Sequence, residues 1–167
     1  MLRLYSAPDV VALREDDPLA GLKIVPLSAF ARRRVATMLN PLRFQLHIAR
    51  ALAARGIETG PVIRTNISYG ALQIVRHTGA MAIIDPVTAY GLSLPGVVIR
   101  PVDVTIPFYW GVLAAEKRPL RPVAQALVDA VDVVAERSIV GLKKLDPALA
   151  GQLVAGAASD TNYGNDL

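Results

Sequence analysis

The sequence predicts an α/β fold, in which a parallel sheet carries helices on its faces. Short β-rich runs alternate along the chain with segments of helical periodicity, and that order is typical of such sheets. An apolar content of 53% fits strands that are buried on both faces. With 167 residues the chain can form one compact domain or two small lobes that share a hinge.

Composition excludes several kinds of chemistry. The chain has no cysteine, which removes disulfides, thiolate metal sites and a cysteine nucleophile. Two histidines, His47 and His77, are too few for a metal site without supporting carboxylates. We therefore expect neither a metal nor a cofactor.

Charge and hydropathy bear on partners and location. The net charge of +4 permits a nucleic-acid partner, but the run Arg32–Arg34 is the one dense basic cluster and is interpreted as a solvated loop. The longest apolar stretch, Val104–Ala115, is too short to cross a bilayer. The N-terminus does not have the pattern of a signal peptide. We expect a soluble cytoplasmic protein with no membrane partner.

The elements of the first hundred residues follow from periodicity and from stop signals. Strands are expected at Pro8–Leu13, Arg34–Met38, Val62–Thr65 and Ala80–Ile84. Helices are expected from Asn40-Pro41 to Arg55, over Ser68–His77, and briefly after Asp85-Pro86, with a helical turn at Leu27–Arg32.

Three successive strands end where a helix begins. The junctions are Asn40-Pro41, Asn66-Ile67-Ser68 and Asp85-Pro86, and each supplies residues that can cap a helix. Because parallel strands finish on one edge of a sheet, we expect the three caps to converge there. Helix N-termini offer free N–H groups and partial positive charge, so this edge would suit a small anion such as a carboxylate. In the alternative interpretation, each cap only satisfies its own helix.

The chain changes character after Gly96. An extended run is interrupted by Pro101 and Pro107, which predicts a strand that leaves one sheet and enters another. The helix Pro122–Arg137 follows, and its apolar side is predicted to face a core. The members of that face are Val123, Ala126, Leu127, Ala130, Val131 and Val134. A short helix capped by Asp146 comes next, and the C-terminal end is expected to fray.

Landmarks in fixed order carry a family resemblance. Val10–Leu13 leads into the turn Asp17–Ala20, which matches a "DhPLA" motif. Leu72–Pro86 matches "lV..G.Gia.lP", and Arg118–Val128 matches "r.lspaa..f...l". In this order the motifs resemble the effector-binding domain of the LysR-type transcriptional regulators, over residues 1 to about 137.

The resemblance implies a periplasmic-binding-protein-like pair of α/β lobes with an effector in the cleft. Residues 1–6 would be a crossover strand, 7–100 effector-binding lobe two, and 101–137 the return strand and helix of an incomplete lobe one. Residues 138–167 would be a C-terminal extension that is partly disordered. The DNA-binding domain of such a regulator would lie before Met1, so the chain would be a fragment or a truncated product.

The resemblance and the caps together name candidate ligand-binding residues. These are Thr37, Asn40, Leu42, Asn66, Ile67, Ser68 and Asp85. Asn40, Asn66 and Ser68 would exchange hydrogen bonds with the effector, and Asp85 could pair with an ammonium group while it also caps its helix. The expected effector is an amino acid, an opine or another small carboxylate. DNA would be reached only through the domain that this chain lacks.

Self-association is a further expectation. The strand Ile106–Ala115, with Phe108–Trp110, would lack its usual sheet partners and expose apolar surface, which favours a homo-oligomer. By resemblance, Arg76 and His77 on the helix that begins at Ser68 would face a partner subunit.

The competing hypothesis is an α/β hydrolase that uses Ser68. The segment "NISYG" supplies half of a G-x-S-x-G nucleophile elbow, but Asn66 stands in place of the first glycine. His77 lies at the far end of the same predicted helix and cannot activate the serine. The chain is therefore not expected to be an enzyme. The sequence also departs from the family's "G.G" at Thr78 and Ala80, so the helix is expected to stop one residue away, at Gly79.

Overall fold

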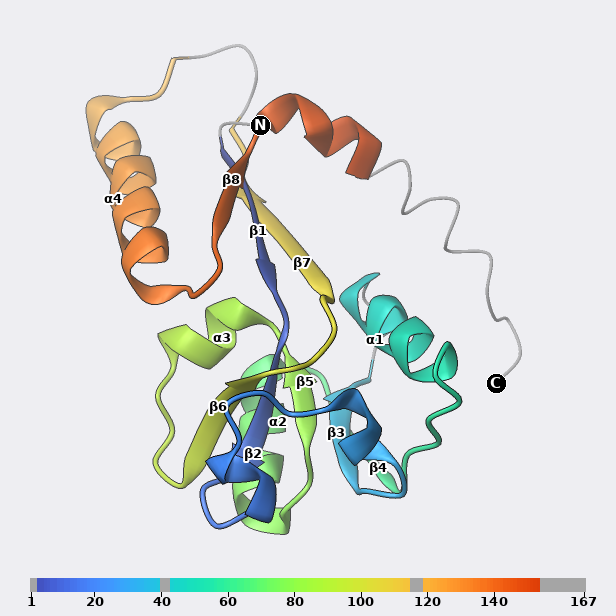
Figure 1. The fold of residues 1–167 in the computed structure, drawn as a ribbon. Coiled ribbons are helices and arrows are strands. Elements are labelled where there is room, and N and C mark those ends of the chain that lie inside the picture. The colour runs from blue at the N-terminus through green and yellow to red at the C-terminus, as the bar shows by residue number, and fades with distance from the viewer. Residues whose placement is uncertain (1–2, 40–42, 115–118, 154–167) are drawn as a thin grey trace. The chain divides into compact units, whose positions relative to one another are not determined.

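The computed structural model describes residues 3–39, 43–114 and 119–153, and the chain divides into two compact units (Figure 1). Unit 2 consists of Ala7–Phe108 and Ser138–Gly141. Unit 1 consists of Met1–Ser6, Tyr109–Arg137 and Leu142–Leu167. Whether these units correspond to the expected lobes, with the boundaries given above, stays a prediction.

A mixed sheet is the centre of unit 2. Its strands are β2 (Val10–Arg14), β3 (Val35–Met38), β4 (Val62–Thr65), β5 (Ala82–Ile84) and β6 (Val97–Pro101). β2 pairs antiparallel with β5 on one side and with β6 on the other. β3 pairs parallel with β4 and meets the chain before β5 through a parallel bridge from Val35 to Met81. The strand order is therefore β4-β3-β5-β2-β6.

The expectation of a wholly parallel sheet was wrong at β2. The run Val10–Leu13 is buried at every position, as in a parallel strand, yet it runs antiparallel to both neighbours. An unbroken apolar pattern reports burial on both faces and carries no information on strand direction. β3 and β5 lie within two residues of their predicted bounds, and β4 has the predicted bounds.

Helices and helical turns follow the strands of unit 2. They are η1 (Pro18–Gly21), η2 (Leu27–Phe30), α1 (Arg43–Ala53), α2 (Ser68–Thr78) and α3 (Pro86–Gly91). The predicted stop of α2 is confirmed: Gly79 has a φ of 66°, and its N–H donates to the Val75 carbonyl at 3.1 Å. Glycine takes this left-handed conformation without a steric penalty, which is why the helix ends there.

Both faces of the unit 2 sheet are covered. Val11 and Leu13 of β2 pack on one face with Phe30 of η2 and Ile48 of α1. On the opposite face Val10 and Ala12 pack against α2 and α3, through residues that include Ala71, Leu72, Val75 and Ala89. Alternate side chains of one central strand thus belong to two different core clusters.

In its described residues, unit 1 contains most of a smaller sheet and of a long helix. Its strands are β1 (Arg3–Pro8), β7 (Pro107–Val112) and β8 (Lys143–Leu145), in the order β7-β1-β8, and the helix is α4 (Pro122–Ser138). β1 and β8 are antiparallel, with Leu4 opposite Leu145. β7, which contains Phe108–Trp110, is hydrogen-bonded to β1. The expectation that this strand lacks its usual sheet partners stays a prediction. The polar segment "KKL" of β8 gave no strand signal.

The predicted buried face of α4 was also wrong. Val128 and Ala135 are the buried residues of this helix, whereas Val123, Leu127 and Val134 are 73%, 67% and 60% exposed. Ala126 and Ala130 are exposed as well, and Val131 is half-buried. Helical spacing correctly predicts which residues share a face, but it cannot say whether another element covers that face.

The predicted cap near the C-terminus is confirmed, since Asp146 Oδ1 accepts a hydrogen bond of 2.9 Å from the Ala148 N–H at the start of η3 (Pro147–Leu149). The start of α1 at Asn40-Pro41, the motif residue Arg118 and the expected fraying after residue 153 lie outside the described residues. In the described part of the chain, no helix combines the length and the apolar character needed to span a membrane.

Candidate functional site

The carboxyl ends of β3, β4 and β5 define one edge of the unit 2 sheet. β3 and β4 are parallel, with Thr37 opposite Arg64 and Met38 opposite Thr65. The bridge of Val35 to Met81 makes β3 and β5 parallel as well. The chain segments that follow these strands therefore leave the sheet on the same side. Ligands of open α/β sheets bind outside such an edge, and we call it the carboxyl edge.

Thr37 brings β3 into contact with α1 at this edge. Its hydroxyl donates a hydrogen bond to Gln45 Oε1 of α1. A cavity of about 10 Å³ lies beside it, between Thr37, Phe30 and Ile48. That volume holds one water molecule at most and leaves no room for an effector. The neighbouring candidates Asn40 and Leu42 lie outside the described residues.

The N-terminus of α2 is the second component of the edge. Ile67 occupies the capping position and offers no side-chain oxygen, so the expected cap at Asn66-Ile67-Ser68 was wrong. Asn66 and Ile67 are exposed, and Ser68 is half-buried as the first helical residue. The opening N–H groups of a helix have no partner within the helix itself. The first turn of α2 therefore presents donors and partial positive charge on the carboxyl edge.

Gly70 lets this first turn lie close to β4. A Cβ at Gly70 would stand 2.3 Å from the Thr65 hydroxyl oxygen. Any side chain there would require the Thr65 side chain or the first turn of α2 to shift. The glycine in "NISYG" is therefore explained by packing, and it needs no nucleophile elbow.

Asp85 is the third component. Its side chain is 6% exposed, and Oδ1 accepts a hydrogen bond of 2.7 Å from the Thr88 N–H. Pro86 opens α3, as the sequence predicted. Asp85 is thus a helix cap, and the capping bond occupies one of its two carboxylate oxygens.

Asp9 was missed by the sequence analysis. It lies between β1 and β2, it is 1% exposed, and its N–H donates to the Ile106 carbonyl at 2.8 Å. Val10 is opposite Ile84 in the antiparallel ladder, so the same register continued by one residue sets Asp9 opposite Asp85. A lone aspartate before an apolar strand is no motif. The one available signal in the sequence was a charged residue directly before four apolar ones.

The surroundings of Asp9 are unusual for a carboxyl group. Within the described ranges, neither of its oxygens has a hydrogen-bond partner. Burial, with a smaller contribution from the charge of Asp85, raises the pKa of Asp9 to about 8. Taking a carboxylate out of water without a partner favours the neutral form, which is the cause of this shift.

A larger cavity of unit 2 lies elsewhere. It has a volume of about 240 Å³, and Leu72, Tyr90, Leu94 and Ile99 contribute to its lining. Burial there raises the pKa of the Tyr90 hydroxyl. The lining holds no Asp, Glu, Lys, Arg or His, so this space offers a carboxylate effector no charged partner.

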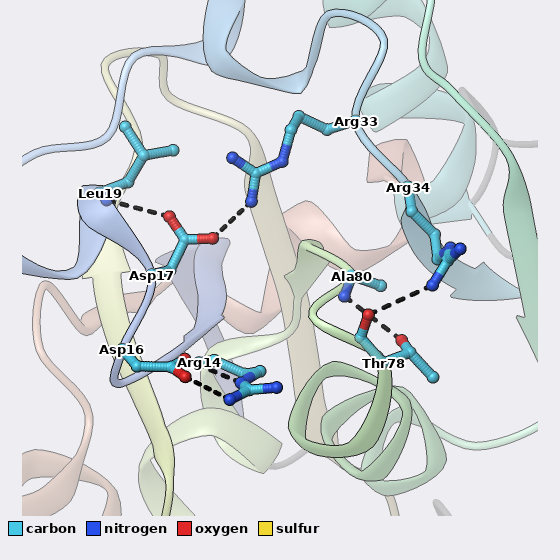
Figure 2. A network of polar contacts seen from close by, with 8 residues as sticks. All are labelled: Arg14, Asp16, Asp17, Leu19, Arg33, Arg34, Thr78 and Ala80. Atoms are coloured by element: carbon cyan, nitrogen blue, oxygen red, sulfur yellow. Dashed lines mark hydrogen bonds and ion pairs between the residues drawn. The ribbon is translucent and has the colours of Figure 1, made fainter.

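The arginine run lies at the opposite edge, where β3 begins. Figure 2 shows that Arg33 pairs with Asp17, whose Oδ1 caps η1 by accepting a hydrogen bond of 2.9 Å from the Leu19 N–H. The Arg34 guanidinium donates to the Thr78 carbonyl at 3.3 Å. Both arginines therefore make contacts within unit 2, and Arg33 binds the first residue of the "DhPLA" turn. The altered Thr78–Ala80 turn precedes β5 and so belongs to this edge too, away from the candidate site.

The hydrolase hypothesis gains no support from the geometry. Ser68 opens α2 and His77 lies in its last turn, so about 13 Å of helix axis separates them. A serine nucleophile needs its base within hydrogen-bond reach.

A sheet with helices on both faces, whose parallel strands end together beside the N-terminus of α2, places unit 2 among the lobes of periplasmic-binding-protein-like domains. The chain belongs to the LysR substrate-binding domain family, since the family model described as "LysR substrate binding domain" matches residues 1–135. The resemblance and the fold class predicted from the motifs are thereby confirmed.

Solved structures with this fold include regulatory and effector-binding domains. The regulatory domain of MetR from N. meningitidis is 17% identical, with a TM-score of 0.60 over 87% of this chain and 68% of that one. The CcmR regulatory domain of Synechocystis PCC6803, solved with 2-PG, is 19% identical, with a TM-score of 0.55 over 80% and 67%. The BenM effector-binding domain with benzoate is 17% identical, with a TM-score of 0.56 over 81% and 63%. The chain thus spans about two thirds of each of these structures.

Proposed function

We propose that the chain is the ligand-sensing part of a LysR-type transcriptional regulator and that it binds a small anionic or zwitterionic metabolite at the carboxyl edge. The observation that carries this proposal is the N-terminus of α2, which has no side-chain cap at Ile67 and stands where β3, β4 and β5 end. A carboxylate placed there would accept hydrogen bonds from the opening N–H groups of the helix.

The side chains of the edge would then orient the ligand. Asn66 and Ser68 flank the α2 N-terminus, and Thr37 lies on the strand next to β4. Asp85 would remain a helix cap and would also face the ligand with its second oxygen. Structures with the same fold were solved with 2-PG, benzoate and shikimate, each of which is a small molecule.

The role in transcription requires partners outside this chain. A DNA-binding domain on the same regulator would convert ligand binding into a change at a promoter, and association of subunits would transmit it. A cytoplasmic location and the absence of any catalysed reaction belong to the same proposal. The arginines of the run that contact Asp17 and Thr78 are already engaged, which argues against direct DNA binding by this chain.

A thermal-shift screen tests the proposal directly. Amino acids, opines and small carboxylates are added to the chain, and a true effector raises the melting temperature because it binds only the folded state. Calorimetric titration then gives its Kd. If no compound of these classes raises the melting temperature or gives binding heat, the proposed function is wrong.

A charge variant locates the ligand. Ser68→Asp adds a negative charge at the N-terminus of α2, where the charge favours the helix but repels a carboxylate. We expect Kd to rise at least ~10-fold while the fold is kept, a change of about 1.4 kcal/mol. Gln73→Glu adds the same charge further along α2 and should leave Kd within about twofold. Equal effects of both variants would place the anion elsewhere.

A further inference from the structure

Asp9 and Asp85 form an acidic pair that the proposed function does not explain. They come from different elements, since Asp9 precedes β2 and Asp85 follows β5. The antiparallel register sets their backbones opposite one another. Both residues lie just outside their strands, at the same end of the β2–β5 ladder. The negative charge of Asp85 contributes to the raised pKa of Asp9, which agrees with their lying close together.

No ion pair of Asp9 or Asp85 is present among the described residues. Asp85 uses one oxygen to cap α3, whereas neither oxygen of Asp9 has a hydrogen-bond partner in the part of the chain that the structure describes. Buried polar groups in native proteins are almost always satisfied, and an exception calls for an explanation such as a ligand. A buried carboxylate is stable when a cation and further hydrogen bonds compensate its lost hydration.

The position of the pair bears on the kind of cation that it would bind. Asp85 directly follows β5, so the pair lies on the carboxyl edge where β3 and β4 also end. At that edge the first turn of α2 offers donors to an anion, while Asp9 and Asp85 offer acceptors to a cation. Separate places for the two charges fit a zwitterion better than a simple carboxylate.

We propose that Asp9 and Asp85 bind the cationic nitrogen of the effector, so that the chain recognises amino-bearing carboxylic acids and rejects their des-amino counterparts. This inference rests on the proposed function and names the ligand class of the same site. With its pKa raised to about 8, the Asp9 carboxyl is mostly protonated at pH 7 before a ligand binds. When an ammonium group enters, that proton leaves to the buffer, and the ionised carboxylate pairs with the cation.

Asp9 also makes a hydrogen bond near the points where the chain passes from one unit to the other. Its backbone N–H donates to the Ile106 carbonyl, which directly precedes β7, and residue 9 itself directly follows β1. An effector that ionises Asp9 therefore changes the charge next to both connecting segments. Sensing at this point needs no contact with the remainder of β1 or β7.

Matched ligand pairs test the inference on the full chain. The probes are L-glutamate and glutarate, L-leucine and 4-methylpentanoate, and L-arginine and 5-guanidinopentanoate. In the pair that contains a binder, the amino acid should bind at least ~10-fold more tightly than its des-amino partner. Titration at pH 7 in phosphate and in Tris should reveal release of about one proton per ligand bound.

The variant Asp9→Asn keeps the shape of the side chain and removes its charge. We expect it to abolish the preference for the amino group and the proton release, while the des-amino acid binds as before. Asp16→Asn is the matched control, because Asp16 is an exposed aspartate of unit 2 that pairs with Arg14. This control should keep both the preference and the proton release.

A measurement without ligand keeps the inference testable if the variant fails to fold. The pKa of Asp9 is raised from 3.8 to about 8 in the folded chain. Below about pH 4 the group is neutral in both the folded and the unfolded state, so it costs no stability. As pH rises from there through about 8, ionisation favours the unfolded chain and the free energy of unfolding falls. Asp85 is the charged group whose interaction contributes to this shift. The wild-type melting temperature should fall over this range, and an unchanged melting temperature would show that Asp9 already has a counter-charge.

The outcomes separate the two proposals. If des-amino acids bind as tightly as amino acids and Asp9→Asn changes neither affinity nor proton release, the acidic pair is not the cation subsite, although the chain still senses carboxylates. If none of the probes and none of the screened metabolites binds, the proposed function itself fails and the subsite with it.

Discussion

Unit 2 and unit 1 differ in how their apolar side chains are buried. In unit 2 the central strand β2 is covered on both faces, and its side chains from Val10 to Leu13 belong to core clusters that also hold residues of α1, α2 and α3. In unit 1 the long helix α4 buries Val128 and Ala135 while Val123, Leu127 and Val134 stay largely exposed. The same chain thus contains a closed core and an uncovered apolar face.

A polar cluster adds to the few buried apolar residues of unit 1. The Tyr5 ring stacks on Trp110 with 4.1 Å between the ring centroids, and the Tyr5 hydroxyl donates to Asp132 of α4. Arg3 Nε donates to the other oxygen of Asp132 at 2.8 Å, and Lys144 Nζ lies 2.8 Å from Glu136 Oε1. These contacts join α4 to β1 and β8 through charges. An apolar pattern therefore stabilises the fold only when another element covers it.

The largest expected effect comes from the closed core. Phe30 is fully buried in unit 2, so Phe30→Ala should lower the free energy of unfolding by about 3–5 kcal/mol through lost contacts and a cavity. Leu127→Ala, on the exposed face of α4, is the control and should cost less than about 0.5 kcal/mol. Urea unfolding followed by circular dichroism measures both. Equal losses would mean that the α4 face is covered in solution.

A smaller effect is expected from the polar cluster of unit 1. Hydrogen bonds from Tyr5 and from Arg3 hold the pKa of Asp132 below its usual value. The group therefore stabilises the folded chain at neutral pH, and this contribution is lost as pH falls below about 4. Asp132→Asn should cost about 1–3 kcal/mol at pH 7 and progressively less toward pH 3.

The single tryptophan reports on this change. Trp110 stacks on Tyr5, so its fluorescence follows the unfolding of unit 1 in urea. Gln125→Leu, which removes a hydrogen bond to Asp129 on the exposed part of α4, is the control and should stay within about 0.5 kcal/mol at every pH. A loss in Asp132→Asn that does not depend on pH would contradict the charged role of Asp132.

The smallest effect on stability, but a clear one on association, is expected at the uncovered face of α4. Leu127→Glu should change the free energy of unfolding by no more than about 0.5 kcal/mol. It should nevertheless abolish concentration-dependent self-association in light scattering, because an exposed apolar patch favours contact between copies. Val87→Glu, at an exposed valine of α3 in unit 2, should leave association unchanged. A wild-type chain that stays monomeric at all concentrations would refute this prediction.

The sequence was informative about local structure for physical reasons that can be named. Asp85-Pro86 and Asp146-Pro147 were found because a short acceptor and a fixed φ suit only the start of a helix. Gly79 was found because a left-handed residue ends a helix. The cap at Asn66-Ile67-Ser68 failed because Ile67 took the capping position. Spacing alone does not decide which of several neighbours will occupy it.

What the chain determines by itself is therefore the order of its elements, their ends and the motifs that mark its family. Caps, periodicity and glycine stops act over a few residues, so a linear pattern can specify them. Tertiary structure decided the rest: the direction of β2, the pairing of β7 with β1, and which side of α4 is covered. It also set Asp9 opposite Asp85 across 76 positions of sequence. Registers between distant strands depend on how whole surfaces pack, and no local signal encodes them.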